Sequence, residues 1–236
     1  MMLWFKAWLE TRWRFAFIAG TMLFAWAAPL WAPLFHLRTP PGVSDSRLWM
    51  AVHLASIFLY IFAAIYLAGS GINSQTTYSA TSGFHPSMLF TLSLPVSRRR
   101  LLFVRAGLGA LQTGILVAIM AAYTVFQRPG GTTAPQFLVY LARAMVCTMV
   151  VYALSTLLAC LLDEMWQFYS GFLCCIAAFV LQFRVSLVSW LSPLRGMSLI
   201  SYPIGGPVPW APVISSLLLT AGLMYASMLI VQRKEY

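Results

Sequence analysis

Residues 101–126 read LLFVRAGLGALQTGILVAIMAAYTVF and contain a single charged side chain, Arg105. An α-helix needs about 20 predominantly apolar residues to cross the hydrocarbon core of a bilayer. The stretch begins directly after three consecutive arginines, residues 98–100, and ends before the turn-forming sequence QRPGG at 127–131. It therefore predicts a membrane-spanning helix with sharp limits at both ends.

The composition of the whole chain agrees with this prediction. Of its 236 residues, 61% are hydrophobic and only 8% are charged, whereas about 25% of the residues of an ordinary soluble domain are charged. A soluble globular protein is excluded. The net charge of +10 would suggest nucleic-acid binding in a soluble protein, but here the lysines and arginines lie mostly between apolar segments. We therefore expect no nucleic-acid partner.

The apolar runs predict an all-α, polytopic membrane protein with six transmembrane helices in a single transmembrane domain, residues 1–236. The predicted spans are residues 15–35, 48–69, 101–126, 137–162, 166–191 and 210–231. The fifth span is broken, because its apolar run stops at Gln182 and Arg184 and resumes briefly before Pro193. Further prolines and glycines follow, and they predict short re-entrant helices before the last span.

The first fourteen residues have a different pattern from the spans. Lys6, Glu10 and Arg14 recur along one helical stripe, while aromatic and aliphatic side chains occupy another. This amphipathic arrangement favours a helix in the plane of the lipid headgroups. We therefore expect residues 1–14 to form an interfacial elbow helix that precedes the first span.

The distribution of cations predicts the orientation of the chain. With the amino terminus in the cytoplasm, six spans place nine cations on inner flanks and five on outer flanks, and cytoplasmic flanks are enriched in such residues. The inner set is Lys6, Arg12, Arg14, Arg98, Arg99, Arg100, Arg105, Arg233 and Lys234, and the outer set is Arg38, Arg47, Arg128, Arg184 and Arg195. Both termini are therefore predicted to be cytoplasmic.

No catalytic constellation is visible in the sequence. The three histidines, His36, His53 and His85, fall in separate regions of the predicted topology, whereas a zinc site needs clustered ligands. The phosphate-binding sequence G-x-x-x-x-G-K-[ST] is also absent. We therefore expect that the chain is not an enzyme and carries no cofactor of its own. If it works in an ATP-driven system, we expect the nucleotide-binding domain to lie on another chain.

Two ionisable residues lie at membrane depth and are candidates for a substrate path. They are His53 in the second predicted span and Arg143 in the fourth. Each also has a structural interpretation, because the histidine could serve as a hydrogen-bonded core residue and the arginine could extend to the headgroups. None of the predicted spans contains an acid, which argues against an ion-coupled secondary carrier.

The segment at 85–105, HPSMLFTLSLPVSRRRLLFVR, combines a short half-apolar helix with a cationic cluster. Its first part, residues 85–94, alternates apolar side chains with serine and threonine, and Pro95 ends the helix. A cytoplasmic helix of this kind could dock into a groove on a partner protein. The alternative is a juxtamembrane cationic anchor, which explains the arginines but leaves the half-apolar helix unexplained.

The sequence TLSLPVSRRRLL at residues 91–102, followed by Arg105, resembles the cytoplasmic segment after the second span in permease subunits of ABC-2 type transporters. The wider plan is similar too, with an elbow helix, six spans and broken helices before the last span. Two departures from the family are that residues 70–84 contain no acid and that no ATPase domain is fused to the chain.

The resemblance implies a transport complex in the plasma membrane, the inner membrane of a bacterium. A second permease chain, identical or paralogous, would sit beside this one in the lipid bilayer. A separate ATP-binding-cassette ATPase subunit would bind ATP and magnesium, and the resemblance favours export. The first, second and fifth spans would line the dimer interface and the substrate path.

The resemblance also implies which residues contact the ATPase. Residues 85–94 would be the coupling helix, and the turn after the fourth span would make a smaller contact, although that turn could equally be a helix cap. The implied interface consists of His85, Met88, Leu89, Leu92, Leu94, Arg98, Arg99, Asp163 and Glu164. The alternative function is a non-ABC integral membrane protein, either a membrane-embedded enzyme or an assembly factor.

Overall fold

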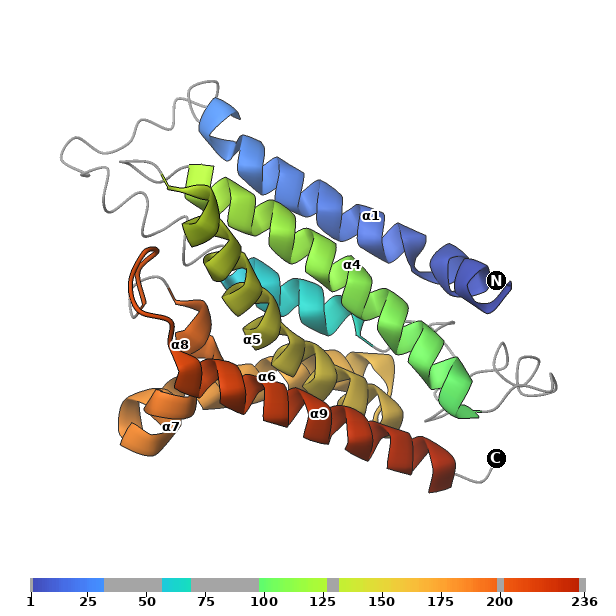
Figure 1. Ribbon diagram of the computed structural model, residues 1–236. Helices are drawn as coiled ribbons and strands as arrows, with labels where there is room; N and C mark the ends of the chain where they lie inside the picture. Colours follow the sequence, from blue (N-terminus) through green and yellow to red (C-terminus); the bar gives the residue numbers. More distant parts are fainter. Residues whose placement is uncertain (1, 32–56, 69–97, 127–131, 199–201, 234–236) are drawn as a thin grey trace.

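The computed structural model describes residues 2–31, 57–68, 98–126, 132–198 and 202–233 (Figure 1). Within these ranges most of the chain is helical, and none of these residues lies in a β-strand. The labelled helices are α1 (Met2–Trp31), α4 (Arg98–Phe126), α5 (Ala134–Leu161), α6 (Glu164–Arg184), α7 (Ser186–Leu191), α8 (Pro193–Met197) and α9 (Trp210–Arg233). A further apolar helix, Ile57–Leu67, belongs to the second predicted span.

Four of these helices are long and apolar enough to cross a bilayer, namely α4, α5, α6 and α9, with spans of 20 to 28 residues. They coincide with the third, fourth, fifth and sixth predicted spans. The structure thus supports a helical membrane protein. The first two predicted spans, 15–35 and 48–69, extend into 32–56 and 69, outside the described residues, so the total of six spans stays a prediction.

The amino-terminal residues do not form the separate elbow helix that we expected for residues 1–14. Instead α1 continues from Met2 to Trp31 as one helix. Its first half packs along α4, where Ala7 is buried in a cluster with Val104 and Leu108. No proline or glycine interrupts the chain before Gly20, so nothing in the local sequence ends the helix.

Two helix boundaries follow from local sequence. The helix α5 begins three residues before the predicted span, because Thr133 is its N-cap residue and its backbone N–H donates to Gln136 Oε1 at 3.2 Å. At the other boundary, α6 ends at Arg184 and Val185 is extended, with φ −121° and ψ 113°. The predicted break in the fifth span, and short helices before the last span, are therefore confirmed.

The helix α5 occupies the centre of the bundle, in contact with α4, α6, α8 and α9. Of its most apolar stretch, 61% is buried inside the molecule, compared with 17% for α6 and 11% for α9. The outer faces of α6 and α9 are thus apolar and exposed, with side chains such as Leu173 and Leu218 facing away from the core. Such faces suit contact with lipid or with another membrane chain.

Both termini lie at the same end of the bundle in Figure 1, together with the start of α4 and the turn between α5 and α6. The opposite end carries α7, α8 and the segment that leads into α9. The predicted topology likewise puts the termini, the start of α4 and the turn between α5 and α6 on one side of the membrane, and the segment between α6 and α9 on the other. The assignment of the first end to the cytoplasm stays a prediction.

Candidate functional site

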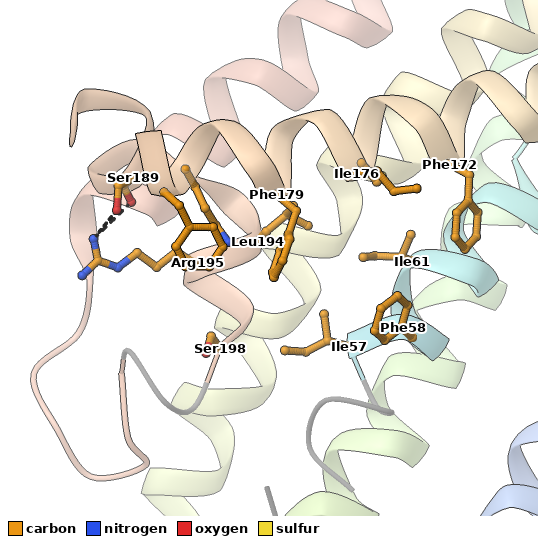
Figure 2. A pocket seen from close by; sticks show the side chains of 13 residues that line it. Ile57, Phe58, Ile61, Phe172, Ile176, Phe179, Ser189, Leu194, Arg195 and Ser198 are labelled. Carbon is orange, nitrogen blue, oxygen red and sulfur yellow. Dashed lines mark hydrogen bonds between the residues drawn. The ribbon is translucent and has the colours of Figure 1, made fainter. Parts of the chain in front are cut away.

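A cavity of about 520 Å³ lies between the helix Ile57–Leu67 and the region formed by α6, α7 and α8 (Figure 2). Its volume falls in the range of about 300–1,000 Å³ that is usual for small-molecule sites. It is lined by Ile57, Phe58, Ile61, Phe172, Cys175, Ile176, Phe179, Gln182, Phe183, Ser189, Leu194, Arg195 and Ser198.

The two helices that form the walls of the cavity contact each other near the start of α6. Near the start of α6, Gln167 Nε2 donates to the carbonyl oxygens of Ile65 at 3.3 Å and Ala68 at 3.0 Å. Gly171 lies in the same contact, where an added Cβ would be 3.5 Å from the side chain of Ile65. Farther along α6, the side chains on the cavity side are large and line the cavity.

One face of α6 supplies the apolar wall of the cavity. Phe172, Ile176, Phe179 and Phe183 follow one another at intervals of four, three and four residues, which places them on one side of a helix. Phe179 and Phe183 are in edge-to-face contact, with ring centroids 5.1 Å apart. Phe183 is 72% exposed, so the cavity opens to the surface of the molecule.

The opposite wall comes from the first turns of the helix Ile57–Leu67. Ile57, Phe58 and Ile61 project from it toward the α6 face (Figure 2). Phe58 is 61% exposed although it lines the cavity. The apolar part of the site is therefore a groove that is open along its side.

The polar part of the cavity lies at the end formed by α7 and α8. Figure 2 shows Ser189 and Arg195 together there, with Phe172 at the far end of the cavity. Arg195 Nη1 donates to Ser189 Oγ at 2.6 Å, and Ser192 Oγ donates to Gln182 Oε1 at 3.1 Å. The break after Arg184 allows this arrangement, because it folds α7 and α8 back toward the last turn of α6.

No acidic residue of the described helices neutralises Arg195. The acids of these ranges are Glu10, in the amino-terminal part of α1, and the pair at residues 163–164, where α6 begins. Since α6 has 21 residues and rises about 1.5 Å per residue, the start of α6 lies about 30 Å from its end. Among the described residues, the guanidinium of Arg195 thus donates to a carbonyl oxygen and a hydroxyl oxygen of Ser189 and to no carboxylate.

Arg143 lies beside the cavity in a buried cluster rather than on the cavity wall. It is only 5% exposed, and its Nη2 donates to the backbone carbonyl of Tyr202 at 2.9 Å. Its guanidinium lies 5.5 Å from the ring centroid of Tyr140 and 6.0 Å from that of Tyr202. In this structure the side chain contacts the segment that follows α8.

Tyr202 connects this cluster to the cavity. Its ring centroid lies 5.9 Å from the guanidinium carbon of Arg195, so the same ring is close to both arginines. At the inner side of the cluster, the hydroxyl oxygens of Tyr60 and Tyr140 are 3.4 Å apart. Because Tyr60 belongs to the helix Ile57–Leu67, the cluster links that wall of the site and the segment beside Arg195 to α5.

The structure places few of the other predicted site residues. His53 and the coupling-helix residues His85, Met88, Leu89, Leu92 and Leu94 lie outside the described residues. Arg98 and Arg99 belong to the first turn of α4, and Glu164 to the first turn of α6. Asp163 is the N-cap residue of α6 but makes no side-chain capping hydrogen bond. These four positions all lie at the end of the bundle that holds the termini.

Sequence reasoning did not identify the polar end of the cavity. In the sequence Arg195 is one of several predicted outer cations, and Gln182 is part of a predicted helix break. The sequence feature that could have indicated this polar end is a single arginine that follows Pro193 between two apolar segments. Among the described residues, no group of three histidine, cysteine or acidic side chains could hold a metal ion.

Comparisons with known proteins found no matching family model, no matching curated protein and no matching solved structure.

Proposed function

We propose that this chain is the membrane-spanning permease subunit of an ABC-2 type transporter, an exporter that works with a separate ATPase subunit. The observation that supports the proposal best is the position of the cavity. Its two walls belong to the second and fifth predicted spans, which are spans that the family resemblance assigns to the substrate path.

The other end of the bundle supports the same proposal. The first turn of α4, the turn at Asp163 and both termini lie together at that end. In the proposed complex this end contacts the ATPase, through residues 85–94 and, more weakly, through the turn at Asp163. The carboxylate of Asp163 makes no capping hydrogen bond with its own helix, which is consistent with a contact to a partner.

The exposed faces of α6 and α9 support the presence of a second permease chain. A helix whose outer face is apolar must contact lipid or protein, and α6 also forms one wall of the cavity. In the proposed complex α6 of each chain lies near the dimer interface, so that the substrate path is formed between the two permease chains.

The proposal is tested by co-expression of the chain with an ATP-binding-cassette ATPase encoded beside its gene. We expect a stable complex in detergent, and ATP hydrolysis that requires the ATPase and is absent from the purified chain alone. The matched control is an ATPase variant without its phosphate-binding lysine, which should assemble but not hydrolyse ATP. Hydrolysis by the purified chain alone, or failure to assemble with the encoded ATPase, would contradict the proposal.

A further inference from the structure

We propose that the cavity binds an anionic membrane phospholipid, with an acyl chain along the α6 groove and the headgroup at Arg195. The part of this inference that concerns transport rests on the proposed function, because it makes this lipid the substrate class of the permease. Binding itself does not depend on an ATPase. The inference is carried by the polarity, length and charge of the cavity.

Like a lipid molecule, the cavity is apolar along most of its length and polar at one end. Along α6 and the helix Ile57–Leu67 its lining is aromatic or aliphatic apart from Cys175, whereas Gln182, Ser189, Arg195 and Ser198 gather at one end. A small polar solute would leave the long apolar part unfilled. A neutral hydrocarbon would leave Arg195 without an anionic partner.

The length of the groove also fits one lipid leaflet. Phe172 and Phe183 are eleven residues apart on α6, so the apolar wall between them is about 17 Å long. Half of the roughly 30 Å hydrocarbon core is about 15 Å. An acyl chain that begins at Arg195 would therefore reach to about the middle of the bilayer.

The charge of the site favours a lipid over a second copy of this chain as the occupant. Arg195 donates to Ser189 and lies beside Tyr202, and both of these partners are uncharged. The described helices of a second copy offer no carboxylate here, because their acids, Glu10, Asp163 and Glu164, lie toward the other end of the bundle. A phosphate headgroup supplies the missing charge together with acceptors for the serine hydroxyls.

The groove is accessible from the side. Phe58 is 61% exposed, Phe179 is 51% exposed and Phe183 is 72% exposed, although all three line the cavity. An acyl chain could therefore enter the groove sideways from the surrounding leaflet, without separation of packed helices.

The test uses the full chain in nanodiscs that contain equal amounts of phosphatidylglycerol and phosphatidylcholine. In one arm the phosphatidylglycerol carries a photoreactive diazirine on its acyl chain, and in the other arm the phosphatidylcholine does. After irradiation, mass spectrometry compares labelling of α6 with labelling of the exposed face of α9. We expect the anionic lipid to label α6 about fivefold more than the neutral lipid, with equal labelling of α9.

Two charge variants separate the role of Arg195 from general attraction to cations. Arg195→Gln should reduce the preference on α6 to the level seen on α9. Arg184→Gln removes the same charge from an exposed residue at the end of α6, outside the cavity lining, and should leave the preference intact. Equal labelling of α6 by both lipids in the unaltered chain, or an unchanged preference in Arg195→Gln, would overturn the proposal.

A third variant acts on the groove instead of the charge. Ile176→Trp should fill the apolar part and lower labelling of α6 by both lipids several-fold, even if Arg195→Gln fails to insert. Unchanged labelling in Ile176→Trp would also overturn the proposal. Failure of the chain to assemble with an ATPase would contradict the proposed function and leave the lipid result standing.

Discussion

The guanidinium of Arg143 in α5 donates a hydrogen bond of 2.9 Å to the backbone carbonyl of Tyr202, 59 residues later in the chain. The ring of Tyr202 in turn lies beside Arg195, the cation at the polar end of the cavity. Arg143 therefore influences the cavity indirectly, because it fixes the segment against which Arg195 packs.

Replacement of Arg143 by Met should loosen this segment. The partly buried carbonyl of Tyr202 would lose its donor, which costs less than the roughly 1–3 kcal/mol of a fully buried group. We expect a lower Tm in detergent and faster thiol labelling of a cysteine introduced at the exposed Gly206. The control is Arg184→Met, which alters an exposed arginine. An unchanged Tm and labelling rate in Arg143→Met would show that the hydrogen bond does not hold the segment.

Gly109 should be essential for the close packing of α4 on its neighbours. An added Cβ there would collide with the hydroxyl of Tyr152, and it would lie 3.1 Å from the carbonyl oxygen of Leu67. Overpacking of this kind costs about 1–3 kcal/mol. We therefore expect Gly109→Ala to lower the Tm measured in detergent.

The same helix offers a matched control for this prediction. An added Cβ at Gly114 has nothing within 4 Å, so Gly114→Ala should be neutral or slightly stabilising, because alanine favours a helix interior. Tyr152→Phe removes the colliding hydroxyl together with its hydrogen bond of 2.8 Å to the carbonyl of Ala106, so Gly109→Ala should lower the Tm less when it is introduced into Tyr152→Phe than into the unaltered chain. Equal effects of the two alanine substitutions would contradict the packing argument.

The contact between α1 and α4 can be tested by cross-linking. Gln112 Nε2 donates to Thr11 Oγ1 at 2.9 Å, and both side chains are buried. In a background without the native cysteines, Thr11→Cys and Gln112→Cys should be joined by a short bifunctional thiol reagent. The pair Trp13→Cys and Gln112→Cys should not react, because Trp13 is exposed. Failure of the Thr11→Cys and Gln112→Cys pair to cross-link would favour an elbow helix that lies away from α4.

The limits of the spans were predictable because they depend on local sequence. The predicted spans 137–162 and 210–231 correspond to Ala134–Leu161 and Trp210–Arg233. Long apolar runs between turn-forming residues leave little choice of secondary structure in a bilayer. The break after Arg184 was predictable for the same reason, since polar residues and Pro193 interrupt the apolar run.

The path of α1 and the cavity were not predictable, because they depend on contacts between distant residues. The charged stripe of Lys6 and Arg14 suggested a helix at the membrane surface, but burial of Ala7 against α4 places it along the bundle. Likewise, Ile61 and Ile176 line one cavity from helices that are far apart in the sequence. No local pattern in either helix indicates the other wall.

The predicted topology can be tested at the two ends of the bundle. A cysteine at Gly206, which is exposed beside α8, should react with an impermeant thiol reagent in intact cells. A cysteine at Asp163, at the start of α6, should react only after the membrane is permeabilised. The cation distribution requires this result, because cytoplasmic flanks carry the larger share of lysine and arginine. The reverse pattern would invert the orientation of the whole chain.

The coupling role proposed for residues 85–94 depends on the apolar side chains of that segment. If they dock into a groove on the ATPase, replacing Leu89 and Leu92 by Asp should abolish co-purification of the ATPase while the inserted chain persists. Each buried leucine contributes about 1.5–3 kcal/mol, and a buried carboxylate without a partner costs several kcal/mol more.

The matched control places the same two charges at Ser87 and Ser93, polar positions in the same segment, and should keep most of the complex. If the segment is only a cationic anchor, both double variants should retain the ATPase, whereas neutralising residues 98–100 should disturb insertion. Normal ATPase recovery with the leucine variants would therefore contradict the coupling-helix assignment.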